Sequence, residues 1–145
     1  MEKSPNKPKA RRIILDTNFL LIPANFNVDI FSELDKTVNF KYELIILDRS
    51  LEELENIILK PKKGVKGADK VAAKVALSLI EVQKSNKKLN ILPSKGHVDD
   101  ALVRLAEEDK TLIVATQDKD LKKRLKEKGV KVIVLKQKKY LAIEG

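Results

Sequence analysis

Acidic residues recur in this chain at four points where a strand-like apolar run gives way to a turn or a helix. They are Asp16, the pair Glu52 and Glu53, the pair Asp99 and Asp100, and Asp118 with Asp120. If the runs are parallel strands with helical crossovers, their carboxyl ends share one edge of a sheet, so these acids can meet there. Carboxylates gathered in one crevice repel one another unless a hard cation such as Mg2+ or Mn2+ compensates them. The pattern therefore predicts a divalent-metal site.

Each acid taken alone also has an ordinary structural explanation. Asp is a favoured helix-capping residue, and acids in the first turn of a helix are stabilised by its dipole. Asp16 could cap a turn, while Asp99 and Asp100 begin a predicted helix; two adjacent acids exceed what one cap needs. Helical periodicity places Glu53 and Glu55 on the two flanks of an apolar stripe, so it leaves the choice between them open.

The elements that must position these acids alternate between strand and helix. Largely apolar or β-branched runs predict strands at 12–15, 42–47, 89–92, 111–115 and 130–135, with a short edge at 140–143. Apolar residues at helical spacing predict helices at 28–38, 51–59, 68–82, 98–106 and 121–129. This order predicts an α/β fold, namely a three-layer α/β/α sandwich with a mainly parallel central sheet of four to five strands.

Length and composition fit one soluble domain of 145 residues. We predict a flexible basic tail at 1–11 and a single domain at 12–145. No apolar run approaches the roughly 20 residues of a membrane span, and no secretory signal is visible, so a cytoplasmic location is expected. The chain has no cysteine, which leaves oxygen ligands for a metal, and His97 is the only histidine, which argues against a zinc site.

The formal net charge of +9 is unevenly distributed. The segment 119–139 contains ten basic residues and two acidic ones, and the segment 60–74 contains six lysines and one acidic residue. Lysines that neutralise phosphates beside an acidic site predict a polyanion with a phosphodiester backbone as partner. Solvated lysine-rich helices, or the high Lys and Glu usage of heat-adapted proteins, are the alternative interpretations. The cations expected to contact the polyanion are Lys62, Lys63, Lys66, Lys119, Lys122 and Lys123.

Four short motifs, in this order, resemble those of the PIN-domain nucleases. They are ILDTN at 14–18, LEEL at 51–54, DDAL at 99–102 and VATQDKDL at 114–121. The resemblance runs from about Arg12 to Leu135 and implies the PIN-like sandwich. The chain resembles archaeal single-domain PIN proteins that are similar to the eukaryotic ribosomal-RNA-processing branch, and VapC-type toxins share the same site.

The resemblance also implies roles for individual residues. The implied catalytic acids and metal ligands are Asp16, Glu53, Asp100 and Asp118, with Glu53 now preferred to Glu55. The implied accessory residues, which would orient ligands or the attacking water, are Asn18, Asp99, Thr116 and Asp120. His97 departs from the family pattern and is expected to be a surface or capping residue.

The implied activity is Mg2+- or Mn2+-dependent endonucleolytic hydrolysis of single-stranded RNA, with Glu53 or Asp118 accepting a proton from water. Two roles stay open. The first is the toxin of a type II toxin-antitoxin pair, partnered by an antitoxin protein; the second is a nuclease that processes a ribosomal precursor. The resemblance further implies a homodimer. Because aromatic residues make up only 4% of the chain, backbone charge and RNA shape are expected to dominate recognition.

Other functional classes fit the residues less well. Phosphatases with an Asp after the first strand usually need a second Asp two residues on, where this chain has Asn18. Receiver-like domains concentrate their acids early, and no glycine-rich phosphate loop supports nucleotide binding. The remaining alternative is a non-catalytic RNA-binding or assembly module that keeps its acids for metal-stabilised folding.

Overall fold

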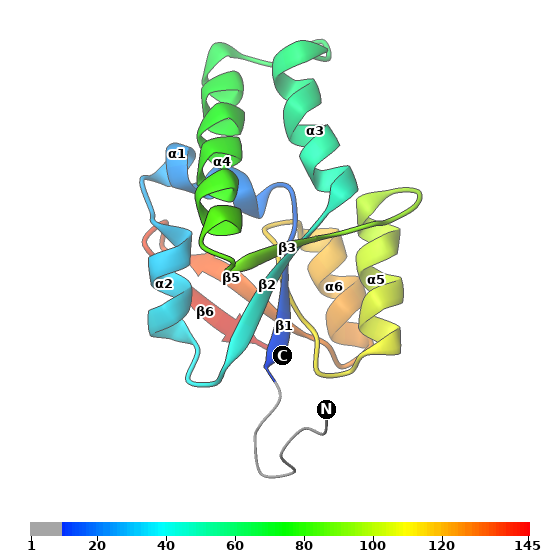
Figure 1. Cartoon of the computed structure of the whole chain (residues 1–145). Coiled ribbons are helices and arrows are strands. Elements are labelled where there is room, and N and C mark those ends of the chain that lie inside the picture. The colour runs from blue at the N-terminus through cyan, green and yellow to red at the C-terminus, as the bar shows by residue number, and fades with distance from the viewer. Residues whose placement is uncertain (1–9) are drawn as a thin grey trace.

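The computed structural model describes residues 10–145, and its backbone alternates between strands and helices (Figure 1). The strands are β1 (Arg11–Leu15), β2 (Tyr42–Leu47), β3 (Leu89–Leu92), β4 (Ile113–Ala115), β5 (Lys131–Lys136) and β6 (Tyr140–Glu144). The helices are η1 (Phe19–Leu21, a 3-10 turn), α1 (Ile22–Phe26), α2 (Ile30–Thr37), α3 (Asp48–Leu59), α4 (Gly67–Ser85), α5 (Val98–Glu108) and α6 (Lys119–Glu127). β1 begins one residue before the predicted boundary, and residues 1–9 of the predicted tail lie outside the described residues.

The six strands form one sheet in the order β3-β2-β1-β4-β5-β6. Neighbouring strands from β3 to β5 are parallel, whereas β6 is antiparallel to β5. The predicted α/β class is therefore confirmed, with six strands instead of four to five because Tyr140–Glu144 pairs along β5. The strand order reverses at β1, and open α/β sheets bind ligands outside the carboxyl ends of their strands at such a switch point.

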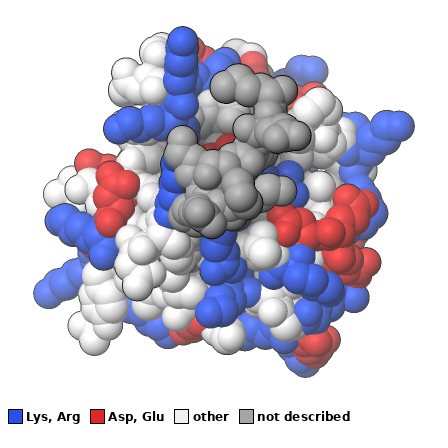
Figure 2. Space-filling view, turned by 60° about the horizontal axis from the view of Figure 1, so that its bottom comes forward, with Lys and Arg blue, Asp and Glu red and all other residues white. Residues whose placement is uncertain are grey.

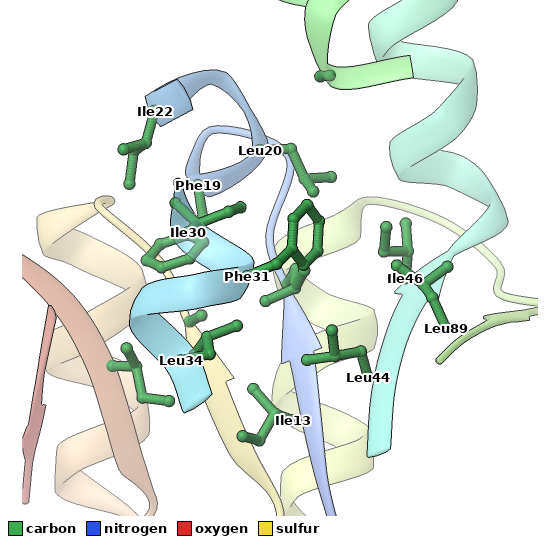
Figure 3. Close-up of a cluster of buried hydrophobic side chains, with 14 of the residues drawn as sticks. Ile13, Phe19, Leu20, Ile22, Ile30, Phe31, Leu34, Leu44, Ile46 and Leu89 are labelled. Atoms are coloured by element: carbon green, nitrogen blue, oxygen red, sulfur yellow. The ribbon is translucent and has the colours of Figure 1, made fainter. Parts of the chain in front are cut away.

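A large apolar cluster covers one face of the sheet (Figure 3). The strand residues Ile13 and Ile46 meet Phe19, Ile30 and Leu34 from η1 and α2, and all five are fully buried. Residues of α4 and α3 complete the cluster. Burial of such a side chain contributes roughly 1.5 to 3 kcal/mol, so this face is a major source of stability.

A second cluster covers the opposite face, where α5 and α6 pack on alternate residues of the same strands. Ile14 and Val114 point to this side, whereas Ile13 and Ile113 point to the other. Because both faces are covered, the buried parts of the central strands, such as Ile13–Leu15 and Leu44–Leu47, are apolar at consecutive positions instead of alternating ones. This arrangement holds the start of α5 and the start of α6 at the same edge of the sheet.

The turn η1 and the helix α1 are absent from the elements predicted from sequence. Together they span only 19–26, which is too short to display a helical period, and Pro23 interrupts the run. Asn27 ends α1 in the left-handed region with φ 55°, a conformation that Asn tolerates better than most residues. The buried Phe19 and Leu20 anchor this segment directly after Asp16.

The face at the amino ends of the strands carries Lys and Arg side chains interspersed with acidic ones (Figure 2). On that face the cations do not merge into one basic surface. Within the described part of the chain, no helix combines the length and the apolar character needed to cross a membrane.

Candidate active site

Asp16 and Asp118 follow the two strands that flank the switch point. β1 and β4 are adjacent and parallel, with Leu15 opposite Ala115. The backbone N–H of Asp16 donates to the carbonyl of Ala115 at 2.9 Å, and Asp118 is the N-cap of α6, where its Oδ1 accepts from the N–H of Leu121 at 3.0 Å. The fold therefore brings the first and last predicted acids to the same edge.

Asp16 is buried, with 3% of its surface exposed, and both of its carboxylate oxygens are held. Oδ1 accepts from the N–H of Thr17 at 2.8 Å, and Oδ2 accepts from the hydroxyl of Thr116 at 2.6 Å. The same hydroxyl oxygen accepts from the N–H of Asp118 at 3.1 Å. Thr116 thus joins Asp16 to Asp118 through one buried side chain.

The side chains of Asn18 and Gln117 accept hydrogen bonds that hold the loop after β1 to the loop after β4, and the loop after β4 to β5. The Oδ1 of Asn18 accepts from the N–H of Gln117 at 3.1 Å, and the Oε1 of Gln117 accepts from the N–H of Leu135 at 2.9 Å. Asn18 was predicted as a support, whereas Gln117 was not predicted. Its position inside the VATQDKDL motif is the only sequence feature that points to it.

Glu53 reaches the site from α3, the helix that follows β2. The hydroxyl of Thr17 donates to its Oε1 at 2.5 Å, so the residue next to Asp16 holds the Glu53 carboxylate. The negative charge of Glu53 raises the pKa of Asp16 and that of Asp99. Glu55 is exposed and has no part in either effect, so the structure brings Glu53 and not Glu55 to the cluster.

Asp48 ties the start of α3 to the loop that precedes α5. Its Oδ1 accepts from both the N–H of Ser94, at 2.9 Å, and the hydroxyl of Ser94, at 2.6 Å. The contact joins the helix of Glu53 to the segment that leads to Asp99. Hydrogen bonds to Ser94 are the main reason that the pKa of Asp48 lies below its usual value.

The two adjacent acids of α5 point in different directions. Partial burial raises the pKa of Asp99, and the negative charges of Asp118, Glu53 and Asp100 raise it further, so Asp99 lies among the site acids. Asp100 instead accepts from Nη2 of Arg124 on α6 at 3.0 Å, and half of its side chain is exposed. The sequence motifs favour Asp100 as the third acid, but the structure brings Asp99 to the other three.

The electrostatic setting of Asp16 is that of a carboxylate without a cationic partner. Burial raises its pKa to about 6, and the charges of Asp99 and Glu53 add to this, against the hydrogen bonds from Thr116 and Thr17. Among the ion pairs of residues 10–145, none includes Asp16, Glu53, Asp99 or Asp118. We call these four residues the acid cluster.

The acid cluster fits a hard divalent cation by its donor chemistry, since every donor is a carboxylate oxygen. The side chains are not drawn together around one point: across residues 10–145, no three His, Cys, Asp or Glu side chains are arranged to hold a metal. The buried charge of Asp16 beside two other acids is nevertheless the kind of charge that a bound cation offsets. His97 is exposed at the N-cap position of α5 and makes no side-chain capping bond.

The predicted cations lie in two separate regions. Lys62, Lys63 and Lys66 are exposed in the segment between α3 and α4, at the tip where these helices extend away from the sheet. On α6, a shallow hollow of about 610 Å³ is lined by Lys119, Lys122, Lys123, Lys126 and Glu127. The α6 lysines are the nearer group in sequence to the acid cluster, because Asp118 caps their helix. Asp120 is exposed in its first turn.

Ionised Asp16 should destabilise the metal-free fold, and Asp16→Asn should relieve this. The folded protein binds a proton at Asp16 with a pKa near 6, against 3.8 ordinarily, so the stability that protonation provides is complete below 3.8 and is lost as pH rises through 6. The loss corresponds to about 3 kcal/mol. In EDTA, the free energy of unfolding of Asp16→Asn relative to that of the wild type should therefore rise between about pH 4 and pH 6 and level off above about pH 6. A difference that does not change with pH would contradict this.

A family model described as a PIN-like domain matches residues 13–138. Ribonuclease VapC4 of Methanocaldococcus jannaschii is 36% identical over 134 residues, which cover 92% of this chain and 97% of that protein. Ribonuclease VapC9 of Archaeoglobus fulgidus is 30% identical over 138 residues, covering 94% of this chain and 91% of that protein.

A solved structure, that of the PIN domain endonuclease Utp24, matches this fold with a TM-score of 0.69. The two sequences are 25% identical, and the match covers 92% of this chain and 90% of the other. The segment 13–138 contains every residue of the acid cluster.

Proposed function

Because the chain belongs to the PIN-like domain family and is homologous to archaeal VapC ribonucleases, we propose that it is a divalent-metal-dependent endoribonuclease acting on single-stranded RNA. The main support is the acid cluster at the switch point of the sheet, where a buried Asp16, which forms no ion pair within residues 10–145, lies beside Glu53 and Asp99 and is linked through Thr116 to Asp118. A non-catalytic RNA-binding module that binds no metal would not require Asp16 to be ionised in a buried position.

Asp16, Asp99 and Asp118 would hold the cation, with Glu53 beside them. Asp99 takes the place that the sequence motifs give to Asp100. When bound, Mg2+ or Mn2+ lowers the pKa of a water molecule and stabilises charge on phosphate oxygens. Thr116 holds Asp16 and the loop of Asp118 in place for this task.

Glu53 is the residue proposed to take the proton of the attacking water. It is exposed, and Thr17 occupies only Oε1, which leaves Oε2 to accept a proton. Asp118 is less suited, because it is one of the three acids proposed to hold the cation. Asn18 and Gln117 keep the loops on either side of the site at a fixed separation.

The lysines of the α6 hollow are proposed to bind the phosphates of the RNA closest to the cleaved bond. Lys119 directly follows Asp118, so the helix that begins at the site continues into this basic surface. Lys62, Lys63 and Lys66 would contact more distant phosphates. Binding of this kind does not read sequence and weakens as salt is added.

The proposed biological role is that of a toxin with an antitoxin protein as partner, acting as a homodimer. Its support is the similarity to two VapC ribonucleases over more than nine-tenths of the chain. The alternative is a nuclease for a ribosomal precursor, which the motif resemblance also allows. A small antitoxin gene adjoining the coding sequence would favour the first role, and its absence would favour the second.

Cleavage should require an added divalent cation. Purified protein incubated with end-labelled single-stranded RNA should produce internal fragments in Mg2+ or Mn2+ and none in EDTA, and excess Mn2+ should restore cleavage. Gel analysis of the fragments, with duplex RNA and single-stranded DNA of the same sequence as controls, measures this. Cleavage that persists in EDTA, or no cleavage with either metal, would contradict the proposal.

A further inference from the structure

We propose that Arg124 binds a phosphate of the substrate RNA at the edge of the acid cluster, and that Asp100 positions its guanidinium. The inference rests on the proposed ribonuclease function. Nη2 of Arg124 donates to Oδ1 of Asp100 at 3.0 Å, and this contact distinguishes Asp100 from its neighbour Asp99. About half of each side chain is exposed, 44% for Arg124 and 50% for Asp100, so the pair lies at the surface.

Arg124 lies close enough to the acid cluster to serve the same substrate. Its Nη2 contacts Asp100, the residue directly after the cluster acid Asp99 in the first turn of α5. Arg124 is also six residues from Asp118 on α6, which at 1.5 Å per residue is about 9 Å along the helix axis. A long Arg side chain at that distance reaches the region between the starts of α5 and α6.

The guanidinium of Arg124 keeps N–H donors that are available to a ligand. Arg carries five N–H groups in a planar fork, and within the described residues only Nη2 of Arg124 makes a hydrogen bond. This geometry matches two oxygens of one phosphate better than a lysine ammonium does. Asp100 fixes one side of the fork, so less side-chain freedom is lost when a phosphate binds the other side.

The competing explanation is that the pair simply joins two helices. Lys128, the C-cap residue of α6, and Glu107 of α5 make an ion pair of that kind, at 2.6 Å and with similar exposure. It lies one helical turn further along α6, at the far end of α5 from Asp99. Exposed ion pairs add little stability. Lys128→Gln is therefore the matched control for Arg124→Gln: each removes one cation and leaves one acid unpaired.

RNA binding tests the inference without cleavage. In an Asp16→Asn background, anisotropy of labelled single-stranded RNA would be measured over a KCl series, with Arg124→Gln or Lys128→Gln added. Arg124→Gln should weaken binding about tenfold and reduce the slope of log affinity against log salt by about 0.7, the value for one phosphate contact on a single strand. Lys128→Gln should leave that slope unchanged, and thermal unfolding should shift equally in both.

Steady-state kinetics separate binding from positioning. Arg124→Gln should raise KM about tenfold with kcat nearly unchanged, Arg124→Lys should recover part of the loss, and Asp100→Asn should raise KM by a smaller factor. Equal salt slopes and equal KM values for Arg124→Gln and Lys128→Gln would overturn the inference. If the otherwise unaltered protein does not cleave RNA, the proposed function fails, whereas the salt slopes still decide whether Arg124 meets a phosphate.

Discussion

Asp16→Asn should abolish RNA cleavage while leaving the protein folded. Asn has the same shape, and its Oδ1 can still accept from Thr17 while its amide donates to the hydroxyl of Thr116. What the substitution removes is the buried negative charge that would hold the cation. Loss of a residue that only orients a metal ligand costs 10- to 100-fold, so loss of a ligand should lower kcat/KM by at least about a hundredfold.

The measurement is kcat/KM in Mn2+, together with thermal unfolding and RNA binding of the same preparation. Glu55→Gln is the matched control, because Glu55 is an exposed acid on the helix of Glu53 that does not influence the pKa of Asp16. It should cleave at the rate of the unaltered protein. Retained RNA binding with lost cleavage is expected for Asp16→Asn; unchanged cleavage would contradict the assignment of Asp16 to the catalytic site.

Asp99→Asn should lose both cleavage and metal binding, whereas Asp100→Asn should keep metal binding. Asp99 lies among the charges of Asp118 and Glu53, and its pKa is raised there. Asp100 is already paired with Arg124 and is half exposed. We expect Asp99→Asn to lower kcat by about a hundredfold or more, by the same reasoning as for Asp16.

Titration of Mn2+ by calorimetry distinguishes the two adjacent acids directly. Each variant removes one negative charge from the first turn of α5, so the interaction with the helix dipole changes equally in both. Each variant is therefore the control for the other. Weakened Mn2+ binding in Asp99→Asn alone would support the assignment made from the structure. The opposite result, with Asp100→Asn losing Mn2+, would support the assignment implied by the sequence motifs.

Periodicity located most of the fold because each element displays its burial pattern locally. The runs at 42–47 and 130–135 are nearly continuous apolar runs, interrupted only by Glu43 and Lys131, as expected for strands covered on both faces, and they correspond to β2 and β5. Periodicity did not locate the helices of the segment 19–26. Its helical turns are too short to repeat, and Phe19 and Leu20 are buried by tertiary contacts.

The sequence predicted that acidic residues form the site, but it did not predict which of the acidic residues lie in it. Periodicity on α3 did not distinguish Glu53 from Glu55 as the site residue. The hydrogen bond from Thr17 to Glu53 does distinguish them. Thr17 lies 36 residues away in sequence, so no local pattern carries that contact. Gln117 was missed for the same reason, since its partner is a backbone N–H on β5.

The amino-acid sequence by itself determined which residue types follow each strand, and hence that carboxylates collect at one edge of a parallel sheet. Only the tertiary structure decided which acid of each pair faces the others. Adjacent residues on a helix point about 100° apart, so the choice between Asp99 and Asp100 depends on how α5 is rotated against the sheet and α6. That rotation is set by the packing of buried residues such as Val98 and Leu102, together with the Arg124 contact.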